Sequence, residues 1–557
     1  MKSWFEAGEA DRALRSLRYY LFLGLLGLVM ALTVATFQHA PGYMDADYYY
    51  VTGLRLADGS GATEPFLWNY LDDPRGLPHP TFTYWMPLAS ILASLGVKIS
   101  GVANFYGARL GSILLAASLP PITAALASRF SSRREASLLA GMLAAFSGFY
   151  LVYLTTTDTF GICMVLGATW LLVVGWGTAP GVVLRDRIDL PAWKPLALGI
   201  IAGLMHLARA DGLIWLGIGV IAVYLGEIKK NAGDSKRIGW RMRIVVPWIG
   251  LLLAGYLLVI GPWLFRNLAL FGSWMPPGGG RAVWITDYDE LYAFPGEILT
   301  LSRWSQIGWL EHLQVRLWAM SQNLQNVLGV QGLILLMPLI SLGFWQFRHD
   351  RRLQLAGLAW VVTFISMSLV FPYQGARGGW FHSGAAFQPL WWALVPIGLE
   401  TVTAWGERRR GWNEGQAGRI LGGGLILLAA GLTALIAIPR LIGSQAMPGW
   451  GDAEARYARL DQALDDLGIG PEAIILVNNP PGFYAATGRP SIAIPDGDIN
   501  TSLAAANRFQ ADYLVLEANH PDGLEAIYRL PVNNEALRFL GSFEGAHVFE
   551  VLLDEGG

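Results

Sequence analysis

Apolar runs, most of them 13 to 22 residues long, recur along the chain and alternate with short polar segments. The first run covers about 19–37, and the later ones lie near 105–126, 136–154, 160–176, 195–207, 213–225, 244–264, 327–345, 353–371, 387–404 and 420–438. A helix needs roughly 20 apolar residues to cross the hydrocarbon core of a bilayer. The pattern therefore predicts a polytopic α-helical membrane protein with about 11 transmembrane helices.

Positive residues between the runs predict the orientation. Four basic residues precede the first run, which we interpret as a signal anchor because no cleavage site of the small-residue type follows it. Further basic clusters fall in every second loop, at 129–134, 185–194, 229–243, 348–352 and 408–410. Cytoplasmic loops are enriched in Lys and Arg, so these loops and the N-terminus are predicted to be cytoplasmic.

This alternation requires that the apolar run 84–99 does not cross the membrane. The run is short and contains Lys98, so we expect a juxtamembrane helix that lies along the surface. The alternative, a crossing helix, would put the 129–134 cluster outside and break the positive-inside pattern. The loop 38–104 is then a large first outer loop.

After Pro439 the composition becomes that of a soluble protein. Helices are predicted at 453–467 and near 502–509, strands at 473–477 and 513–517, and a hairpin at 539–552. We therefore expect a transmembrane domain over 1–438 and a small extracytoplasmic α/β domain over 439–557. The segment 478–482, Asn-Asn-Pro-Pro-Gly, lacks the spacing of a phosphate-binding loop and is predicted to be a plain turn.

Composition agrees with a membrane protein and excludes other classes. Hydrophobic residues make up 53% of the 557 residues, more apolar surface than a soluble fold of this size hides. The net charge of −2 gives no reason to expect a nucleic-acid partner. Cys163 is the only cysteine, so an intrachain disulfide is excluded.

An acid pair opens the first outer loop. Asp45 and Asp47 lie just beyond the first apolar run, where carboxylates suit a general base or a hard-metal ligand acting on a lipid substrate. Tyr49, His79 and Tyr84 belong to an aromatic, polar set in the same loop that suits stacking on sugar rings and hydrogen bonding to hydroxyls. The alternative is that the two acids are only a helix cap or a solvated loop.

Three charged residues at other outer ends allow two interpretations each. Asp158 is the N-cap of the next helix, a second carboxylate that binds a metal or an acceptor hydroxyl, or both. Arg209 and Asp211 form either an ion pair within a Gly-containing turn or a substrate contact.

The remaining outer candidates are cationic. Arg266 either reaches toward lipid headgroups or binds a lipid phosphate. Arg377, His382 and Ser383 lie on a glycine-rich segment and form a candidate anion site of a guanidinium, an imidazole and a hydroxyl. Three histidines, His79, His312 and His382, lie in predicted outer loops, but their spacing matches no metal-ligand motif.

Taken together, these motifs resemble the GT-C superfamily of membrane glycosyltransferases, most of all the branch of protein O-mannosyltransferases and lipid A aminoarabinose transferases. The Asp45–Tyr49 stretch resembles that branch's acidic motif after the first span, with the second acid displaced by one residue. Other matching segments are Leu77-Pro-His-Pro80 with Tyr84-Trp85, Tyr106-Gly-Ala-Arg-Leu110, and Pro262-Trp263 followed by Arg266-Asn267 and Phe271-Gly272.

The resemblance implies a sugar donor linked to polyprenyl phosphate and inversion at the anomeric carbon. Asp45 matches the position of the family's catalytic acid and Asp158 that of a second acid, while the displaced motif leaves open whether Asp45 or Asp47 is the base. Such a donor already has a good leaving group, so a base and cations suffice, with Arg377, Arg266 or a metal as the cation. No cofactor is certain; a divalent cation held by Asp45, Asp158 or His79 stays open.

We therefore expect an inverting glycosyltransferase of the plasma (inner) membrane that acts on the extracytoplasmic face. It would transfer sugar from a polyprenyl-phosphate donor to an envelope lipid, glycan or protein. The alternative is a transporter or flippase of a lipid-linked sugar, which would carry ionisable residues at mid-membrane, where these runs have almost none. A non-catalytic envelope scaffold would explain the C-terminal domain but not the acid pair.

Overall fold

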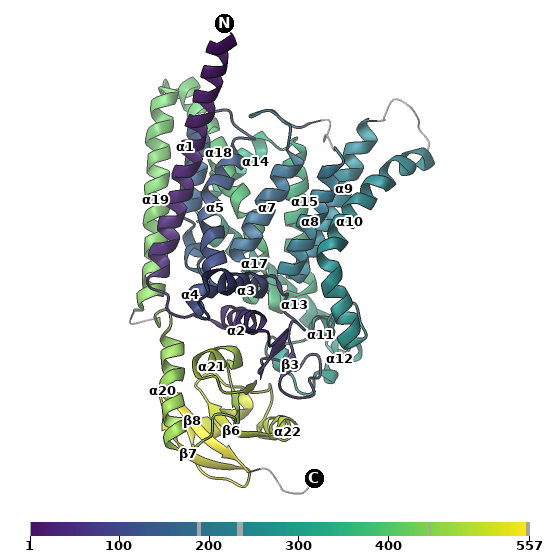
Figure 1. Cartoon of the computed structure of the whole chain (residues 1–557), viewed down its shortest axis with the longest axis vertical. Helices are drawn as coiled ribbons and strands as arrows, with labels where there is room; N and C mark the ends of the chain where they lie inside the picture. The colour runs from purple at the N-terminus through teal and green to yellow at the C-terminus, as the bar shows by residue number, and fades with distance from the viewer. Residues whose placement is uncertain (1, 186–190, 231–237, 445–446, 553–557) are drawn as a thin grey trace. The chain divides into compact units, whose positions relative to one another are not determined.

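The computed structural model describes residues 2–185, 191–230, 238–444 and 447–552 (Figure 1). Part of the predicted basic clusters, including Arg187 and 231–237, lies outside the described residues. The chain forms two compact units. The first consists of Met1–Phe37, Ser112–Pro262 and Leu317–Leu441, and the second of Gln38–Gly111, Trp263–Arg316 and Ile442–Gly557.

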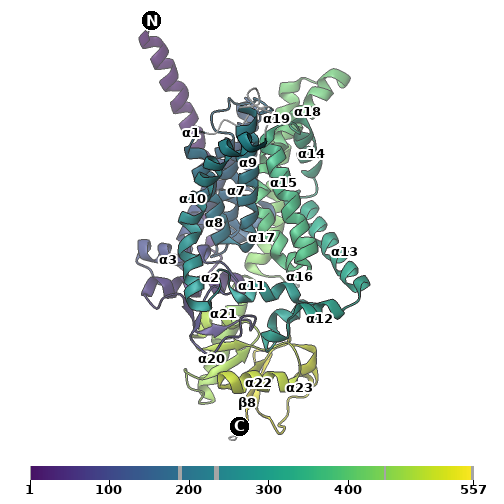
Figure 2. The same ribbon diagram turned by 90° about the vertical axis from the view of Figure 1, so that its right-hand side faces the viewer.

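The first unit is a bundle of apolar helices. It contains α1 (Lys2–Ala35), most of α5 (Leu110–Ala127), α6 (Arg134–Ala145), α7 (Phe160–Val174), α8 (Trp193–Ala208), α9 (Leu213–Lys230), most of α10 (Ile238–Phe271), part of α13 (Trp309–Asn326), α14 (Met337–Gln346), α15 (Arg351–Ile365), α16 (Pro372–Gln374), α17 (Trp380–Gly384), α18 (Gln388–Arg410) and most of α19 (Glu414–Ile442). The first half of α18 is buried on all sides, as expected for a helix that is apolar all round. Helices α6 and α14 pack against α18, and α8 packs against both α7 and α9. Figure 2 shows α14 and α18 side by side.

Among the described residues, five helices are long and apolar enough to cross a membrane. They cover Leu17–Ala35, Phe105–Ala127, Val245–Phe271, Arg351–Val370 and Glu414–Ile442. Four shorter apolar helices, Leu88–Ser100, Phe160–Val174, Trp193–Ala208 and Ala210–Gly226, accompany them. The predicted helical membrane protein is confirmed at this level, whereas the number of about 11 spans stays a prediction.

Two of the predicted runs are not single helices. The run 136–154 ends as an α-helix at Ala145 and continues after Gly148, at φ +61°, as the 3-10 helix η1 (Gly148–Tyr153). The run 327–345 begins as the π-helical turn η6 (Val327–Gln331) and then breaks at Leu333 and Ile334, both with positive φ. Apolar composition predicted burial in both runs but not the backbone breaks.

The second unit begins with α2 (Met44–Asp58), so the acid pair lies on a helix and not in a loop. Next come β1 (Thr63–Glu64), β2 (Phe66–Leu67), β3 (His79–Pro80), α3 (Leu88–Ser100) and α4 (Phe105–Ala108); the segment after α10 adds α11 (Pro277–Arg281), η3 (Ala282–Trp284), η4 (Asp289–Tyr292), η5 (Gly296–Ile298) and α12 (Leu301–Gln306). Helix α3 has 13 residues, fewer than the roughly 20 that a bilayer crossing needs; its position along the membrane surface stays a prediction.

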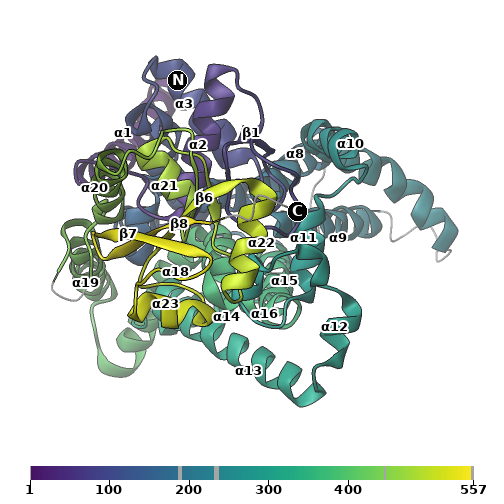
Figure 3. The same ribbon diagram turned by 90° about the horizontal axis from the view of Figure 1, so that it is seen from below.

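A six-stranded sheet with the order β2-β5-β4-β6-β8-β7 forms the core of the C-terminal part (Figure 3). Its strands and helices are α20 (Asp452–Asp466), β4 (Ile474–Val477), α21 (Pro480–Thr487), β5 (Ser491–Ala493), α22 (Ile499–Phe509), β6 (Ala511–Leu516), η10 (Asp522–Leu524), α23 (Glu525–Arg529), β7 (Leu537–Phe543) and β8 (Ala546–Val551). The predicted helices and strands of this segment agree with α20, β4, α22, β6 and the β7–β8 hairpin.

The two faces of the sheet bury alternate residues, as a pleated strand requires. Ile475 and Val477 of β4 face Tyr457 and Leu460 of α20 and Phe483 of α21. Leu476 and Ile492 face the other way, toward Phe509 of α22. The result is an α/β/α arrangement with both faces of the sheet covered by helices.

Residues of the first outer segment complete this sheet. Strand β2 pairs in parallel with β5, so that Phe66 lies opposite Ser491. The Tyr70 hydroxyl donates to the carbonyl of Ala493, and its ring packs in the core beneath the sheet. The sequence treated 38–104 and 439–557 separately and did not predict that one sheet contains strands from both.

Candidate functional site

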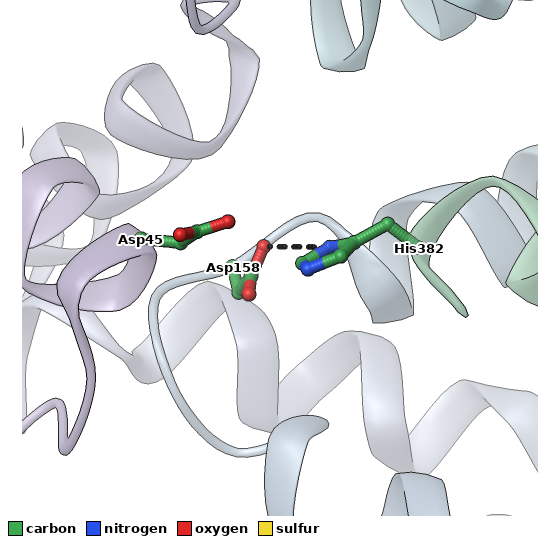
Figure 4. A group of neighbouring side chains, drawn as sticks. All are labelled: Asp45, Asp158 and His382. Atoms are coloured by element: carbon green, nitrogen blue, oxygen red, sulfur yellow. Dashed lines mark ion pairs between the residues drawn. The ribbon is translucent and has the colours of Figure 1, made fainter. Parts of the chain in front are cut away.

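Asp158 and His382 form a close, buried polar pair in the first unit. His382 Nδ1 lies 3.5 Å from Asp158 Oδ1, which also accepts a hydrogen bond from the Thr159 hydroxyl at 3.1 Å (Figure 4). The side chain of Asp158 is fully buried. The N-cap of α7 is Thr159, so the interpretation of Asp158 as that cap is wrong. Asp158 precedes the cap by one residue, and its carboxylate points at the His382 imidazole.

The imidazole of His382 is held by aromatic stacking. Its ring stacks on Phe160, with the two centroids 4.0 Å apart, and Nδ1 also contacts the Thr159 hydroxyl at 3.3 Å. Burial, outweighing the attraction of Asp158, lowers the pKa of His382 to about 4. The imidazole is therefore neutral at physiological pH, the form that ligates metals.

Arg209 lies beside this pair because of the way α8 ends. The helix stops at Ala208, Arg209 is extended, and Gly212 comes so close to Met205 that an added Cβ would lie 2.2 Å from its carbonyl carbon. Arg209 Nε donates to Asp211 at 3.1 Å and to the Ser383 hydroxyl at 3.2 Å. The predicted Arg209–Asp211 ion pair is present, and Ser383 places it next to His382 on α17.

Arg377 lies on the glycine-rich segment before α17. It is exposed and is part of the π-helical turn η8 (Gly375–Gly379), which is kinked at Arg377 and at Gly378, φ +129°. A positive φ of this size is accessible to glycine and rarely to other residues. Its role in anion binding stays a prediction.

The acid pair of α2 divides into one buried and one half-exposed carboxylate. Tyr43 is the N-cap and both acids lie in the first turn, where the helix dipole favours negative charge. Asp45, also labelled in Figure 4, is half-buried. Asp47 is only 7% exposed, and burial, opposed by a hydrogen bond from Asn479, raises its pKa to about 8.

Aromatic rings surround the start of α2. The rings of Trp68 and Trp85 stack with their centroids 4.0 Å apart, and Tyr84 packs edge-on against Trp68. Tyr49 is buried, with its ring tilted against Trp85. The predicted aromatic set therefore does come together, but Tyr49 lies inside it, whereas Tyr84 is partly exposed.

His79 belongs to a buried polar cluster in the second unit. Its Nε2 lies 2.8 Å from Asp72 Oδ2, and His79 is paired with Glu64 across β1 and β3. Burial opposes a positive charge on His79, but Asp72 and Glu64 outweigh it and raise its pKa. Because Asp72 already engages Nε2, the geometry favours an internal role for His79; its sugar contact and its metal ligation stay predictions.

Arg266 is engaged by backbone carbonyls at the end of α10. Its Nη2 donates to Thr81 at 2.7 Å and to Ala62 at 3.3 Å. These bonds join α10 to the segments around β1 and β3 within the second unit. The predicted role of Arg266 at a lipid phosphate stays a prediction.

Sequence reasoning missed Thr159, which adjoins Asp158, and the role of Asn479. The Ser383 hydroxyl was predicted as part of the anion site, but its contact with Arg209 was not. Asp72 was noted in the first outer loop, but its contact with His79 was not predicted. Asn479 lay in the segment interpreted as a turn, although Asn before Pro-Pro is a helix-start signal: its side chain caps α21, accepting from Gly482 N–H at 3.1 Å.

Comparison with known proteins finds the fold among solved structures. No protein-family model matches the chain, and no curated protein matches it in sequence. The oligosaccharyltransferase of Archaeoglobus fulgidus, tethered with an acceptor peptide, is 14% identical over 90% of this chain and 69% of that chain, with a TM-score of 0.54. The same enzyme in complex with Zn and sulfate is 14% identical over 94% of this chain and 72% of that chain, with a TM-score of 0.53.

ArnT from Cupriavidus metallidurans bound to undecaprenyl phosphate is 13% identical over 96% of this chain and 98% of that chain, with a TM-score of 0.50. These are GT-C superfamily proteins. The chain has the GT-C fold. The predicted resemblance is thus confirmed at the level of the fold, and a fold by itself does not fix a substrate.

Proposed function

We propose that this protein is an inverting glycosyltransferase that takes its sugar from a polyprenyl-phosphate donor. The observation that carries the proposal is the buried Asp158–His382 pair beside Arg209 in a chain with the GT-C fold. A carboxylate, a neutral imidazole and a guanidinium together suit a substrate with a hydroxyl and a phosphate. The solved structures with undecaprenyl phosphate and with an acceptor peptide support this substrate class.

In the proposed reaction the acceptor hydroxyl attacks the anomeric carbon from the side opposite the phosphate. The new C–O bond forms as the bond to the phosphate oxygen breaks, and the phosphate leaves with the bonding electron pair. The hydroxyl proton passes to a carboxylate. We assign this general-base role to Asp45, which is half-exposed on the first turn of α2, and expect it to contribute about 10²–10⁴-fold.

Charge on the departing phosphate needs a cation. Arg209 offers a guanidinium already oriented by Asp211 and Ser383, and Arg377 is a second candidate. Asp158 and His382 have donor atoms that fit a divalent cation such as Zn²⁺, which binds carboxylate oxygen and imidazole nitrogen. Such an ion would act as a Lewis acid toward phosphate oxygen. The prediction that Asp45 contributes to the same ion stays a prediction.

We place the reaction on the extracytoplasmic face, with the N-terminus in the cytoplasm, on the strength of the basic clusters. The acceptor is an envelope lipid, glycan or protein. These assignments follow from the sequence pattern and are open to direct test by accessibility labelling of single cysteines introduced into a Cys163→Ser background.

The decisive experiment uses the full-length protein in lipid nanodiscs with a panel of polyprenyl-phosphate sugars. We expect time-dependent release of polyprenyl phosphate, detected by mass spectrometry, and inverted stereochemistry in the product. Asp45→Asn should abolish release. Binding of the donor without turnover, together with its movement across sealed vesicles, would instead indicate the transporter alternative.

A further inference from the structure

The C-terminal domain contacts the acidic helix α2 directly, through Asn479. The Asn479 side chain accepts a hydrogen bond from Gly482 N–H at 3.1 Å and forms a second hydrogen bond with the buried carboxyl group of Asp47. Asn479 therefore links the first turn of α21 to the first turn of α2. Helices α2 and α21 pack against each other around this contact.

Gly482 allows the two helices to approach this closely. A Cβ added at Gly482 would lie 2.8 Å from Asp47 Oδ2 and 2.3 Å from Asn479 Nδ2. Real Cβ atoms do not approach other atoms so closely, so any larger residue would displace α21 or rotate the Asp47 side chain. Gly482 lies inside α21, where any residue can adopt the backbone conformation. The close contact with Asp47 and Asn479, and not the backbone, is therefore what requires a glycine here.

A second contact from the C-terminal segment reaches the residues just before α2. Trp450 Nε1 donates to the carbonyl of Ala40 at 2.9 Å, and the Trp450 ring packs edge-on against Tyr43. Gly42, at φ +96°, lies against the same indole, where an added Cβ would come within 2.4 Å of it. Trp450 thus fixes the start of α2 from the other side.

We propose that Asn479, Gly482 and Trp450 are positioning residues, by which the C-terminal domain orients the first turn of α2 and thereby Asp45. Asp45 lies between the two contacts, three residues after Gly42 and two before Asp47. The proposal rests on the proposed function, because it assigns the C-terminal domain a part in the same reaction. Asp47 then acts through its contact with Asn479 and not on the substrate.

A physical reason supports this division of roles. A general base must lie within hydrogen-bond distance of the proton that it accepts, and a displacement of about 1 Å costs roughly 100-fold in rate. The first turn of a helix is the part most prone to fraying, because its N–H groups lack partners within the helix. Contacts at Ala40 and at Asp47 restrain that turn on both sides of Asp45.

The test compares Asn479→Ala, Gly482→Ala and Trp450→Ala in the full-length protein in nanodiscs. We expect kcat to fall roughly 10- to 100-fold, with KM for the donor within about twofold of wild type. Amide hydrogen exchange over 44–58 should become faster in the same variants, while exchange in β4 and β6 stays as in wild type. Asn507→Ala, an exposed asparagine on α22, is the matched control and should change neither quantity.

A conservative variant separates positioning from a general loss of folding. Asp47→Asn retains a side chain that accepts from Asn479 and should lose less activity than Asp47→Ala, which removes the bond. Unchanged kcat in all three variants would overturn the proposal, and so would faster exchange in α2 without a change in kcat. If the wild type transfers no sugar, the proposed function fails; hydrogen exchange then still decides whether the C-terminal domain restrains α2.

Discussion

The Nδ1 atom of His382 lies 3.5 Å from Oδ1 of Asp158, although more than 200 residues separate the two along the chain. Both side chains are buried, where a polar group is stable only if it has polar partners, and the Thr159 hydroxyl contacts both of them. Asp158→Asn keeps the shape and removes the charge. We expect kcat to fall by about 100-fold or more, measured by polyprenyl phosphate release.

Asp58→Asn is the control for this variant, because Asp58 ends α2 and only caps the next turn through Ser60 N–H. It should transfer sugar as fast as the wild type. A rate for Asp158→Asn close to that of the control would remove Asp158 from the reaction.

Metal binding is expected to depend on the same pair. Isothermal titration of the purified protein with Zn²⁺ should give a saturable signal, and His382→Ala should weaken the affinity by more than about tenfold, because an imidazole ligand is lost. His312→Ala is the matched histidine control, since His312 Nε2 lies 3.0 Å from the carbonyl of Trp304. Equal affinity in the two variants would show that the ion binds elsewhere.

The buried Glu64 predicts a pH-dependent stability of the second unit. Burial raises the pKa of Glu64 from 4.5 to about 7, against the favourable charge of His79 and hydrogen bonds from Thr81 and Tyr48; the charge of Asp72 raises it further. The folded state therefore holds a proton that the unfolded state releases at about pH 4.5. Its stabilising contribution is complete below that pH and is lost as the pH rises through about 7.

Glu64→Gln should flatten this dependence between about pH 4.5 and 7, as followed by the apparent Tm in a series of buffers. Glu535→Gln, an exposed acid in the same unit, is the control and should keep the wild-type slope. A slope that persists in Glu64→Gln would mean that another group takes up the proton.

Arg266 is expected to matter for stability more than for donor affinity. Its bonds to Thr81 and Ala62 join three segments of the second unit, and a charged hydrogen bond contributes about 1.5–3 kcal/mol. Arg266→Gln should lower the apparent Tm while KM for the donor stays within about twofold, since substrate contact is not needed to explain the guanidinium. A large rise in KM with an unchanged Tm would restore the lipid-phosphate interpretation.

Arg209 gives the opposite expectation. Its Nε donates to the side chains of Asp211 and Ser383, which orient the guanidinium, a group whose planar geometry suits phosphate. Arg209→Lys should raise KM for the donor by about tenfold, because a lysine binds phosphate as a point charge and not through two parallel bonds. If KM does not change while kcat falls, Arg209 contacts the reacting atoms only in the transition state.

The predicted helices of the C-terminal segment agree closely with the structure because their signals are local. Apolar residues at helical spacing in 453–467 predict α20, and the buried run 473–477 predicts β4. Helix α13, in contrast, lies between the predicted apolar runs 244–264 and 327–345 and was not predicted. Its polar residues, including Asn323 and Gln325, dilute the apolar stripe that runs along one side of it.

The candidate site was predicted only in part. The sequence pointed to Asp45, Asp158, Arg209 and His382 because they lie at the ends of apolar runs. An ionisable side chain near a bilayer core costs free energy, so its presence there suggests a function. Their distribution between buried and exposed positions was not predictable. Asp47 is two residues from Asp45 and identical to it in type, yet it is the buried one, and Gly482 and Asn479 of α21 and its cap lie against its carboxylate.

The sequence by itself determined the class of the protein, because apolar length, basic loops and helix or strand periodicity depend on neighbouring residues alone. Tertiary structure decided the partners. It brought His382 to Asp158, Ser383 to Arg209, β2 to β5 and Asn479 to Asp47. Such pairs form when whole elements pack, and the free energy that selects them comes from burying apolar surface elsewhere, so no local pattern encodes them.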